Sequence, residues 1–203
     1  MKTNLHQVFQ KSSIAEIKEL VSVRLQTAEA YLTYHNLRHT LDVAEQAERI
    51  ALEEGVSEKD RLLLQVAALY HDIGYLDGHE NHEKRGCKIF QSEAAKWNFS
   101  QEEIDAVCGM ILATKMPQTP GNHLQQIICD ADLDYLGRND FLAIGSGLKK
   151  EYLHFGFLKE EKEWDTLQLR FLEQHRYFTQ TQHILREPAK RKNIAILKNR
   201  LTK

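Results

Sequence analysis

The sequence predicts an all-α protein, folded as a single-domain helical bundle. Apolar residues recur with the helical period along almost the whole chain, and the alternating pattern of β-strands is absent. A length of 203 residues and a hydrophobic content of 42% suffice for one full core. No repeat, low-complexity tract or long linker divides the sequence. We therefore expect one domain over residues 1–203.

Nine helices follow from this periodicity. Their approximate ranges are residues 13–32, 37–54, 57–71, 81–97, 100–114, 124–128, 140–155, 160–185 and 188–201. The sixth places an acidic cluster at its end, and the last three are long amphipathic patterns.

Caps and helix breakers mark the ends of these helices. Residues 13–16 and 100–103 both have the serine-to-glutamate spacing of a capping box. Gly55 suits the left-handed residue that ends the second helix. The prolines and glycine of residues 117–121 enforce a loop before the sixth helix, and Pro188 suits the first turn of the last helix.

Composition restricts the classes of partner. The chain has 27 Lys and Arg against 29 Asp and Glu, so a net charge of -2 gives no electrostatic argument for nucleic acid or an anionic membrane. Residues 1–7 lack the features of a signal peptide, and no stretch approaches the ~20 apolar residues that span a bilayer. The three cysteines lack paired metal-type spacing, which predicts reduced thiols. We expect a cytoplasmic protein with a small soluble substrate.

Three groups of imidazole and carboxylate side chains carry the main functional signal. They are residues 34–39 (YHNLRH), the pair His71 and Asp72 after a long apolar run, and residues 130–134 (DADLD). Mixed nitrogen and oxygen ligands of this kind suit Mn, Fe, Co, Ni or Zn better than an all-oxygen Ca or Mg site. Alone, the His71-Asp72 pair is also what an ordinary helix C-terminus looks like. Together, the three groups predict a metal-dependent enzyme.

Four motifs in this order resemble the HD-domain superfamily of metal-dependent phosphohydrolases. They are residues 34–39, 71–74 (HDIG), 81–83 (NHE) and 130–133 (DADL). The match spans roughly residues 30–140, and the helices from about 140 to 203 would cover this core. The resemblance implies an HD-type helical fold and hydrolysis of a phosphate ester, in a nucleotide or similar compound, by a metal-activated water. The metal ligands that it implies are His39, His71, Asp72 and Asp132.

Other roles follow less directly. Asp130 is the alternative to Asp132 as the last ligand. Either His82 or Glu83 would position the attacking water or carry a proton to the leaving oxygen. A second group of side chains would contact phosphate oxygens, which an arginine can bind in a bidentate manner. These side chains are His35, Arg38, Lys84, Arg85 and Lys115, although His35 also fits a core hydrogen-bonding role and the charged residues also fit a solvated surface.

The resemblance also bears on the number of metal ions. Two-metal members of the superfamily add histidines between the His-Asp pair and the last aspartate, and His82 fits one of these positions. The next expected histidine would lie near residues 114–117, where the sequence has Met116 and, shortly after, Gln118. We therefore expect one divalent transition metal, or a weak second site completed by His79 or His123.

Two further features have structural interpretations. Residues 145–147 (GSG) lack the preceding strand of a phosphate-binding loop, so we interpret them as a turn or helix break. An aromatic set in the C-terminal third is interpreted as core or as the surface of a homodimer, with some members walling the pocket. The set is Phe141, Tyr152, Phe155, Phe157, Trp164, Phe171 and Tyr177.

Three functions stay open at this point. The first is a hydrolase of a small phosphorylated substrate, with a nucleotide as first choice and neither nucleic acid nor membrane as partner. The second is a di-iron oxygenase on the same helical scaffold, against which the missing histidine near Met116 counts. The third is a sensing module that binds a nucleotide without turnover.

Overall fold

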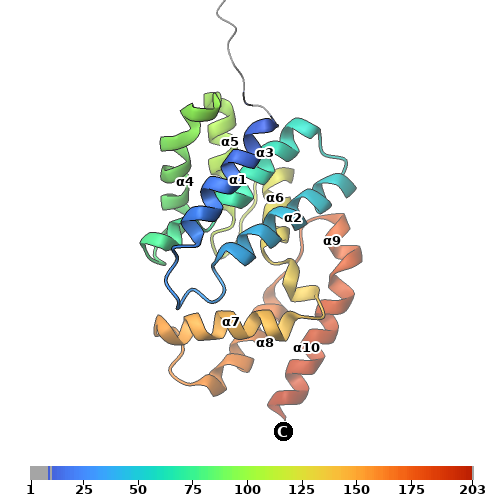
Figure 1. Ribbon diagram of the computed structural model, residues 1–203. Coiled ribbons are helices and arrows are strands. Elements are labelled where there is room, and N and C mark those ends of the chain that lie inside the picture. Colours follow the sequence, from blue (N-terminus) through green and yellow to red (C-terminus); the bar gives the residue numbers. More distant parts are fainter. Residues whose placement is uncertain (1–8, 10, 203) are drawn as a thin grey trace, which may run out of the picture.

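The computed structural model describes Phe9 and residues 11–202, and the secondary structure of this part is entirely helical. Its helices form two layers, a bundle made by the first six α-helices and a smaller layer made by the last four (Figure 1). The all-α prediction is confirmed. The expectation about a signal peptide concerns residues 1–7, which lie outside the described residues. Within the described part, no helix combines the length and the apolarity that crossing a bilayer requires.

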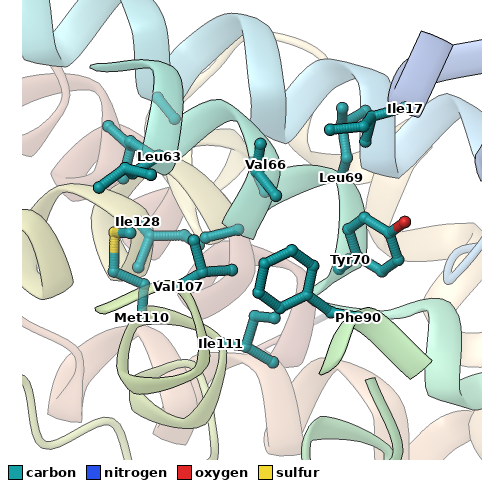
Figure 2. Close-up of a cluster of buried hydrophobic side chains, with 14 of the residues drawn as sticks. Ile17, Leu63, Val66, Leu69, Tyr70, Phe90, Val107, Met110, Ile111 and Ile128 are labelled. Atoms are coloured by element: carbon teal, nitrogen blue, oxygen red, sulfur yellow. The ribbon is translucent and has the colours of Figure 1, made fainter. Parts of the chain in front are cut away.

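The N-terminal bundle is organised around its third helix. Seven of its residues are buried, from Leu63 to Tyr70, and a helix that is apolar on most sides belongs at the centre of a core. Figure 2 labels Leu63, Val66, Leu69 and Tyr70 of this helix, together with side chains from the first, fourth, fifth and sixth helices. Among these is Phe90, whose ring centroid lies 5.3 Å from that of Tyr70. The helices of the bundle are α1 (Ser12–Leu25), α2 (Leu37–Glu53), α3 (Glu58–Tyr70), η1 (Ile73–Asp77), α4 (His82–Glu93), η2 (Ala94–Trp97), α5 (Gln101–Ala113) and α6 (His123–Asp132).

The C-terminal layer has a smaller apolar cluster, which includes Leu136, Phe141 and Leu197. It also buries polar side chains, among them Glu151 and Lys190. In Figure 1, α7 and α8 lie below the bundle, while α9 and α10 run down one side to the C-terminus. The helices of this layer are η3 (Asp134–Gly137), α7 (Phe141–His154), η4 (Glu161–Glu163), α8 (Trp164–Gln174), α9 (Gln180–Leu185) and α10 (Glu187–Leu201).

The predicted continuous helix over residues 160–185 is wrong. The chain leaves the helix after Gln174, with His175 in an extended conformation at ψ 140°. Two backbone N–H groups of the break donate to the buried Asp130 carboxylate, from Phe178 at 2.9 Å and from Thr179 at 2.8 Å. Lys190 donates to the His175 carbonyl at 2.9 Å. Partners distant in the sequence thus satisfy the backbone groups that a continuous helix would have paired.

Helix ends in the bundle follow the predicted caps in most places. The capping box at Ser100 and Glu103 is formed, and Gly55 adopts the left-handed conformation at φ 70°. The first helix differs, because it begins without a side-chain cap and ends at Leu25 instead of reaching residue 32. The Thr27 hydroxyl donates to the Arg24 carbonyl at 2.7 Å and competes there with helix continuation.

The prediction of a turn or break at residues 145–147 is also wrong, because this segment lies inside α7. Both of its glycines permit close contacts instead. A methyl group on Gly145 would overlap the side-chain amide of Gln168, and one on Gly147 would lie 2.8 Å from the Thr33 carbonyl oxygen. Thr33 also donates its hydroxyl to the Gly147 carbonyl at 2.7 Å. The two glycines therefore allow α7 to pack closely against its neighbours.

Candidate metal centre

Three helices bring four of the predicted site residues together. His39 lies in the first turn of α2, where the Asn36 side chain accepts the N–H groups of Arg38 and His39 and so fixes the helix start. His71 and Asp72 directly follow α3. Because α3 is the central apolar helix, its end holds these two side chains in a buried position.

The facing atoms of these side chains are close enough to share one cation. The two imidazole nitrogens, His39 Nε2 and His71 Nε2, lie 3.4 Å apart. Asp72 Oδ2 lies 3.3 Å from the first and 3.1 Å from the second. Asp132, the last residue of α6, places Oδ1 3.2 Å from His39 Nε2 and 3.7 Å from His71 Nε2. Ligand atoms of His39, His71 and Asp72 all lie within 4.8 Å of one another, as a metal site requires.

Burial and charge in this cluster favour a bound cation. Burial alone would lower the pKa of His71, but the carboxylates of Asp72 and Asp132 outweigh it and hold that pKa well above its ordinary value. Burial would likewise raise the pKa of Asp132, yet His39 and His71 lower it to about 2. Asp72 Oδ2 is buried and makes no hydrogen bond of good geometry among the described residues. The four side chains therefore fit a divalent transition metal at the point where they meet.

A backbone contact orients His71 for this role. Its Nδ1–H donates to the Ala68 carbonyl at 2.7 Å, which leaves Nε2 to face the cluster. Metal-binding histidines commonly have this arrangement, in which one ring nitrogen is fixed by a hydrogen bond and the other is free to coordinate. The contact spans one helical turn at the end of α3, and no sequence motif indicates it.

The structure distinguishes between the three aspartates of the DADLD segment. Asp130 is turned toward the backbone of Phe178 and Thr179, as described above, and away from the imidazoles. Asp134 accepts from Arg49 at 3.0 Å and from Arg186 at 2.8 Å. Asp132 is the one that faces His39 and His71, so the geometry favours it over the alternative, Asp130.

The cluster opens onto a cavity of about 630 Å³ between the bundle and the C-terminal layer. Asp72 and Asp132 line one end of this cavity. His82 and Glu83, at the start of α4, line it as well, and His82 Nε2 lies 3.4 Å from Asp72 Oδ1 and 3.6 Å from Glu83 Oε1. His82 Nδ1 donates to the His79 carbonyl at 3.0 Å, so the ring is held with Nε2 toward the carboxylates.

His35 also lines the cavity, and a residue that the sequence analysis missed holds it in place. Glu151 of α7 is fully buried and accepts from His35 Nδ1 at 2.5 Å. Its other oxygen accepts the N–H groups of Tyr34, at 2.5 Å, and His35, at 2.8 Å. One feature of the sequence could have indicated the role of Glu151. It is an acidic residue seven positions after Ile144 and three after Leu148, and therefore lies on the apolar face of that helix.

The lysine and arginine side chains predicted to bind phosphate oxygens do not all lie at the cavity. Lys115 lines the cavity, and so does Arg170, which no motif indicated. Arg38 lines a different hollow, Lys84 is exposed, and Arg85 donates to the backbone carbonyls of Gly74 and Gly78. The structure therefore does not bring Arg38, Lys84 or Arg85 into the cavity.

The two histidines expected to complete a weak second metal site, His79 and His123, lie in different parts of the structure. His79 lines the cavity, whereas His123 is half exposed and lies 3.2 Å from Glu54. Gln118, near the position of the missing histidine, donates toward Asp132 Oδ2 at 3.4 Å. An amide thus contacts Asp132 from the loop where the resemblance to two-metal members predicts an imidazole.

Comparisons with known proteins concern the fold and the range that contains these four residues. The HD domain family matches residues 36–134, a range that contains His39, His71, Asp72 and Asp132. The fold and the site thus define a protein of the HD type, and HD domains typically bind divalent metals. The match over residues 36–134 confirms the resemblance to the HD domain family that was inferred from the motifs.

Two individual proteins are similar to this chain. The crystal structure of a predicted HD superfamily hydrolase from an uncultured Thermotogales bacterium matches with a TM-score of 0.55 and 22% identity, over 79% of this chain and 92% of that one. This match shows the fold. An uncharacterized protein of Clostridium beijerinckii is 36% identical over 76 residues, which are 36% of this chain and 48% of that protein. The aligned region spans about half the length of that relative.

Proposed function

We propose that this protein is a metal-dependent phosphohydrolase that hydrolyses a nucleotide or another small phosphate ester. The main support is the buried group of two imidazoles and the Asp72 carboxylate, with the Asp132 carboxylate 3.2 Å from His39 Nε2, beside a cavity of about 630 Å³. His39, His71, Asp72 and Asp132 would hold one divalent transition metal, which would be Mn, Fe, Co, Ni or Zn.

The chemistry requires an activated water and stabilisation of charge on the phosphoryl group. A divalent ion in this site would lower the pKa of a water from ~15.7 toward ~7 and polarise a phosphoryl oxygen. His82 and Glu83 would orient the attacking water or carry a proton to the leaving oxygen, which contributes ~10²-10⁴-fold. Lys115 and His35, which line the same cavity, would bind the remaining phosphoryl oxygens.

A second metal would bind more weakly. Asp72 Oδ1 faces His82 Nε2 at 3.4 Å, on the side of the carboxylate away from His71, and Glu83 Oε2 is buried without a hydrogen-bond partner among the described residues. These groups supply only one imidazole, and the side chains near residue 116 add none. We therefore assign the principal role to a single ion.

The experiment is a phosphate-release screen over nucleotides and simple phosphate esters, using protein treated with chelator and then supplied with Mn, Fe, Co, Ni or Zn. We expect release only after metal is restored, and none from Asp72→Asn. The matched control is Asp77→Asn, which changes an exposed aspartate at the end of η1 and should leave release unchanged. Two irons per chain with oxygen consumption, or tight nucleotide binding without turnover, would overturn the hydrolase proposal.

A further inference from the structure

The cavity extends beyond the metal cluster into a part that we term the inner compartment, lined by Tyr135, Leu148, Tyr152, Trp164 and Phe171. Tyr152 and Trp164 meet edge to face, with ring centroids 5.6 Å apart. These residues come mainly from α7 and α8 of the C-terminal layer. The inner compartment is therefore walled chiefly by aromatic rings, which suit a flat apolar group.

One amide interrupts these apolar walls. Gln168 of α8 lines the cavity with a residue exposure of 5%, and no other described residue forms a hydrogen bond with its side chain. Gln182, in the same layer, behaves differently: it donates to Asp134 at 2.7 Å and accepts from Arg49 at 3.0 Å. The Gln168 amide is not sealed off from the cavity, so a ligand there can supply the hydrogen-bond partner that the described residues do not.

The sequence of α7 provides the space for this amide. Gly145 lies inside the helix, where a glycine is less favourable than alanine by roughly 0.5–1 kcal/mol. A methyl group at this position would overlap Gln168 Nε2. The glycine therefore keeps the amide in its present place, against the wall of the cavity.

The mouth of the cavity is apolar as well. Phe157 and Met116 both line it and are exposed to 53% and 51%, respectively. Arg170 is an exposed lining residue, and Lys115 belongs to the loop beside the metal cluster. Charged side chains are thus available for one phosphoryl group near the cluster, while the inner compartment offers aromatic walls and one amide.

From these observations, we propose that the inner compartment binds the organic part of the phosphate ester. This part is an uncharged planar ring with an amide-type edge, which presents a donor and an acceptor side by side, as nucleobases do. Gln168 pairs with that edge, because its own amide also presents one acceptor and donors. The inference rests on the proposed function and assigns the substrate specificity of the same site to Gln168.

The test measures binding without any hydrolysis. Uridine and adenosine carry the ring and the sugar but no phosphate, so their affinity for the intact protein, measured by calorimetry, reports the inner compartment alone. We expect saturable binding of at least one nucleoside. Gln168→Met, which keeps the length of the side chain and removes the amide, should weaken that affinity about tenfold, which corresponds to 1.4 kcal/mol. The matched control is Gln91→Met, on an exposed position of α4, which should leave the affinity unchanged.

A second variant keeps the amide but moves it. Gly145→Ala should weaken nucleoside binding because the new methyl group displaces Gln168. Gly109→Ala is its control, since Gly109 lies inside α5, and a methyl group there would meet the Gln125 amide at 3.2 Å, away from the cavity. Thermal unfolding of all four variants verifies that each one is folded.

The outcomes separate the two proposals. Nucleoside binding that depends on Gln168, in a protein that releases no phosphate, would support the inner compartment and overturn the hydrolase. Phosphate release without nucleoside binding, or equal nucleoside affinity in Gln168→Met and Gln91→Met, would overturn the role of Gln168 and leave the hydrolase standing.

Discussion

The two layers of the molecule are stabilised in different ways. The N-terminal bundle is built on a large apolar cluster around α3, beside which it also buries polar side chains such as Gln46, Glu93 and Asp130. The C-terminal layer buries Lys190, Glu151 and Gln168, and it is tied to the bundle by carboxylates such as Asp130 and Asp134. The metal cluster lies at the edge of the apolar bundle, whereas most of the inner compartment belongs to the polar layer. Under the proposed function, the chemistry and the recognition of substrate would therefore reside in separate parts of the fold.

The largest effect should come from the ligands held by the bundle. His71→Ala removes an imidazole whose Nε2 lies 3.1 Å from Asp72 Oδ2. We expect metal affinity to fall by more than about 100-fold, because changing even the groups that orient a ligand costs about 10–100-fold. Metal titration followed by elemental analysis measures this loss. Unaltered affinity in His71→Ala would break the assignment of the cluster to the bundle.

The apolar character of the bundle predicts the next largest effect. Phe90 is fully buried between Tyr70 and Phe99, and Phe90→Ala should lower the free energy of unfolding by about 3–5 kcal/mol. Urea denaturation of the variant and of the natural protein measures this decrease. Phe157→Ala, at an exposed position of the C-terminal layer, is the comparison and should change stability by less than about 0.5 kcal/mol. Similar losses of stability in both variants would contradict the larger contribution that we assign to the bundle core.

A pair of aspartates only two residues apart tests the division between the layers. Asp130→Ala removes the acceptor for the N–H groups of Phe178 and Thr179 and should destabilise the protein by about 2–4 kcal/mol, with metal content unchanged. Asp132→Ala should instead lower metal content. Denaturation and elemental analysis of both variants provide the comparison. Metal lost from Asp130→Ala while it is still folded would reverse the two roles.

A histidine buried in the C-terminal layer gives that layer a pH dependence. Burial and the neighbouring Lys190 lower the pKa of His175 from 6.5 to about 3, and Lys190 Nζ lies 3.3 Å from its Nδ1. Below pH 6.5 the unfolded chain therefore binds a proton that the folded protein excludes, so stability falls as the pH falls, by up to about 1.4 kcal/mol per unit. Denaturation between pH 7 and 5 should show a steeper loss in the natural protein than in His175→Asn. Equal slopes would contradict this assignment.

The same contrast explains which parts of the fold could be predicted from the sequence. In the bundle, burial of apolar residues produces the helical period directly, and the ends of α2 and α5 lie within a residue or two of the expected positions. In the C-terminal layer, residues 160–185 keep that period across a break. The break depends on Asp130 and Lys190, whose partners lie elsewhere in the sequence, so local periodicity does not reveal it.

The candidate site divides in the same way. The grouping of His39, His71, Asp72 and Asp132 was predicted because their motifs are short and keep a fixed order. The roles of Glu151 and Gln168 were not predicted. Glu151 contacts His35 across 116 positions of sequence, and Gln168 is distinguished because no side chain of the described residues pairs with its amide. Both properties become visible only when the two layers are placed against each other.

The most direct test of the central claim is X-ray diffraction at the absorption edge of a metal, from crystals of the protein loaded with Mn or Co. We expect one anomalous peak about 2.0–2.3 Å from the Nε2 atoms of His39 and His71 and from carboxylate oxygens of Asp72 and Asp132. A peak beside Asp130 instead, or no peak at the cluster in a metal-loaded crystal, would contradict it.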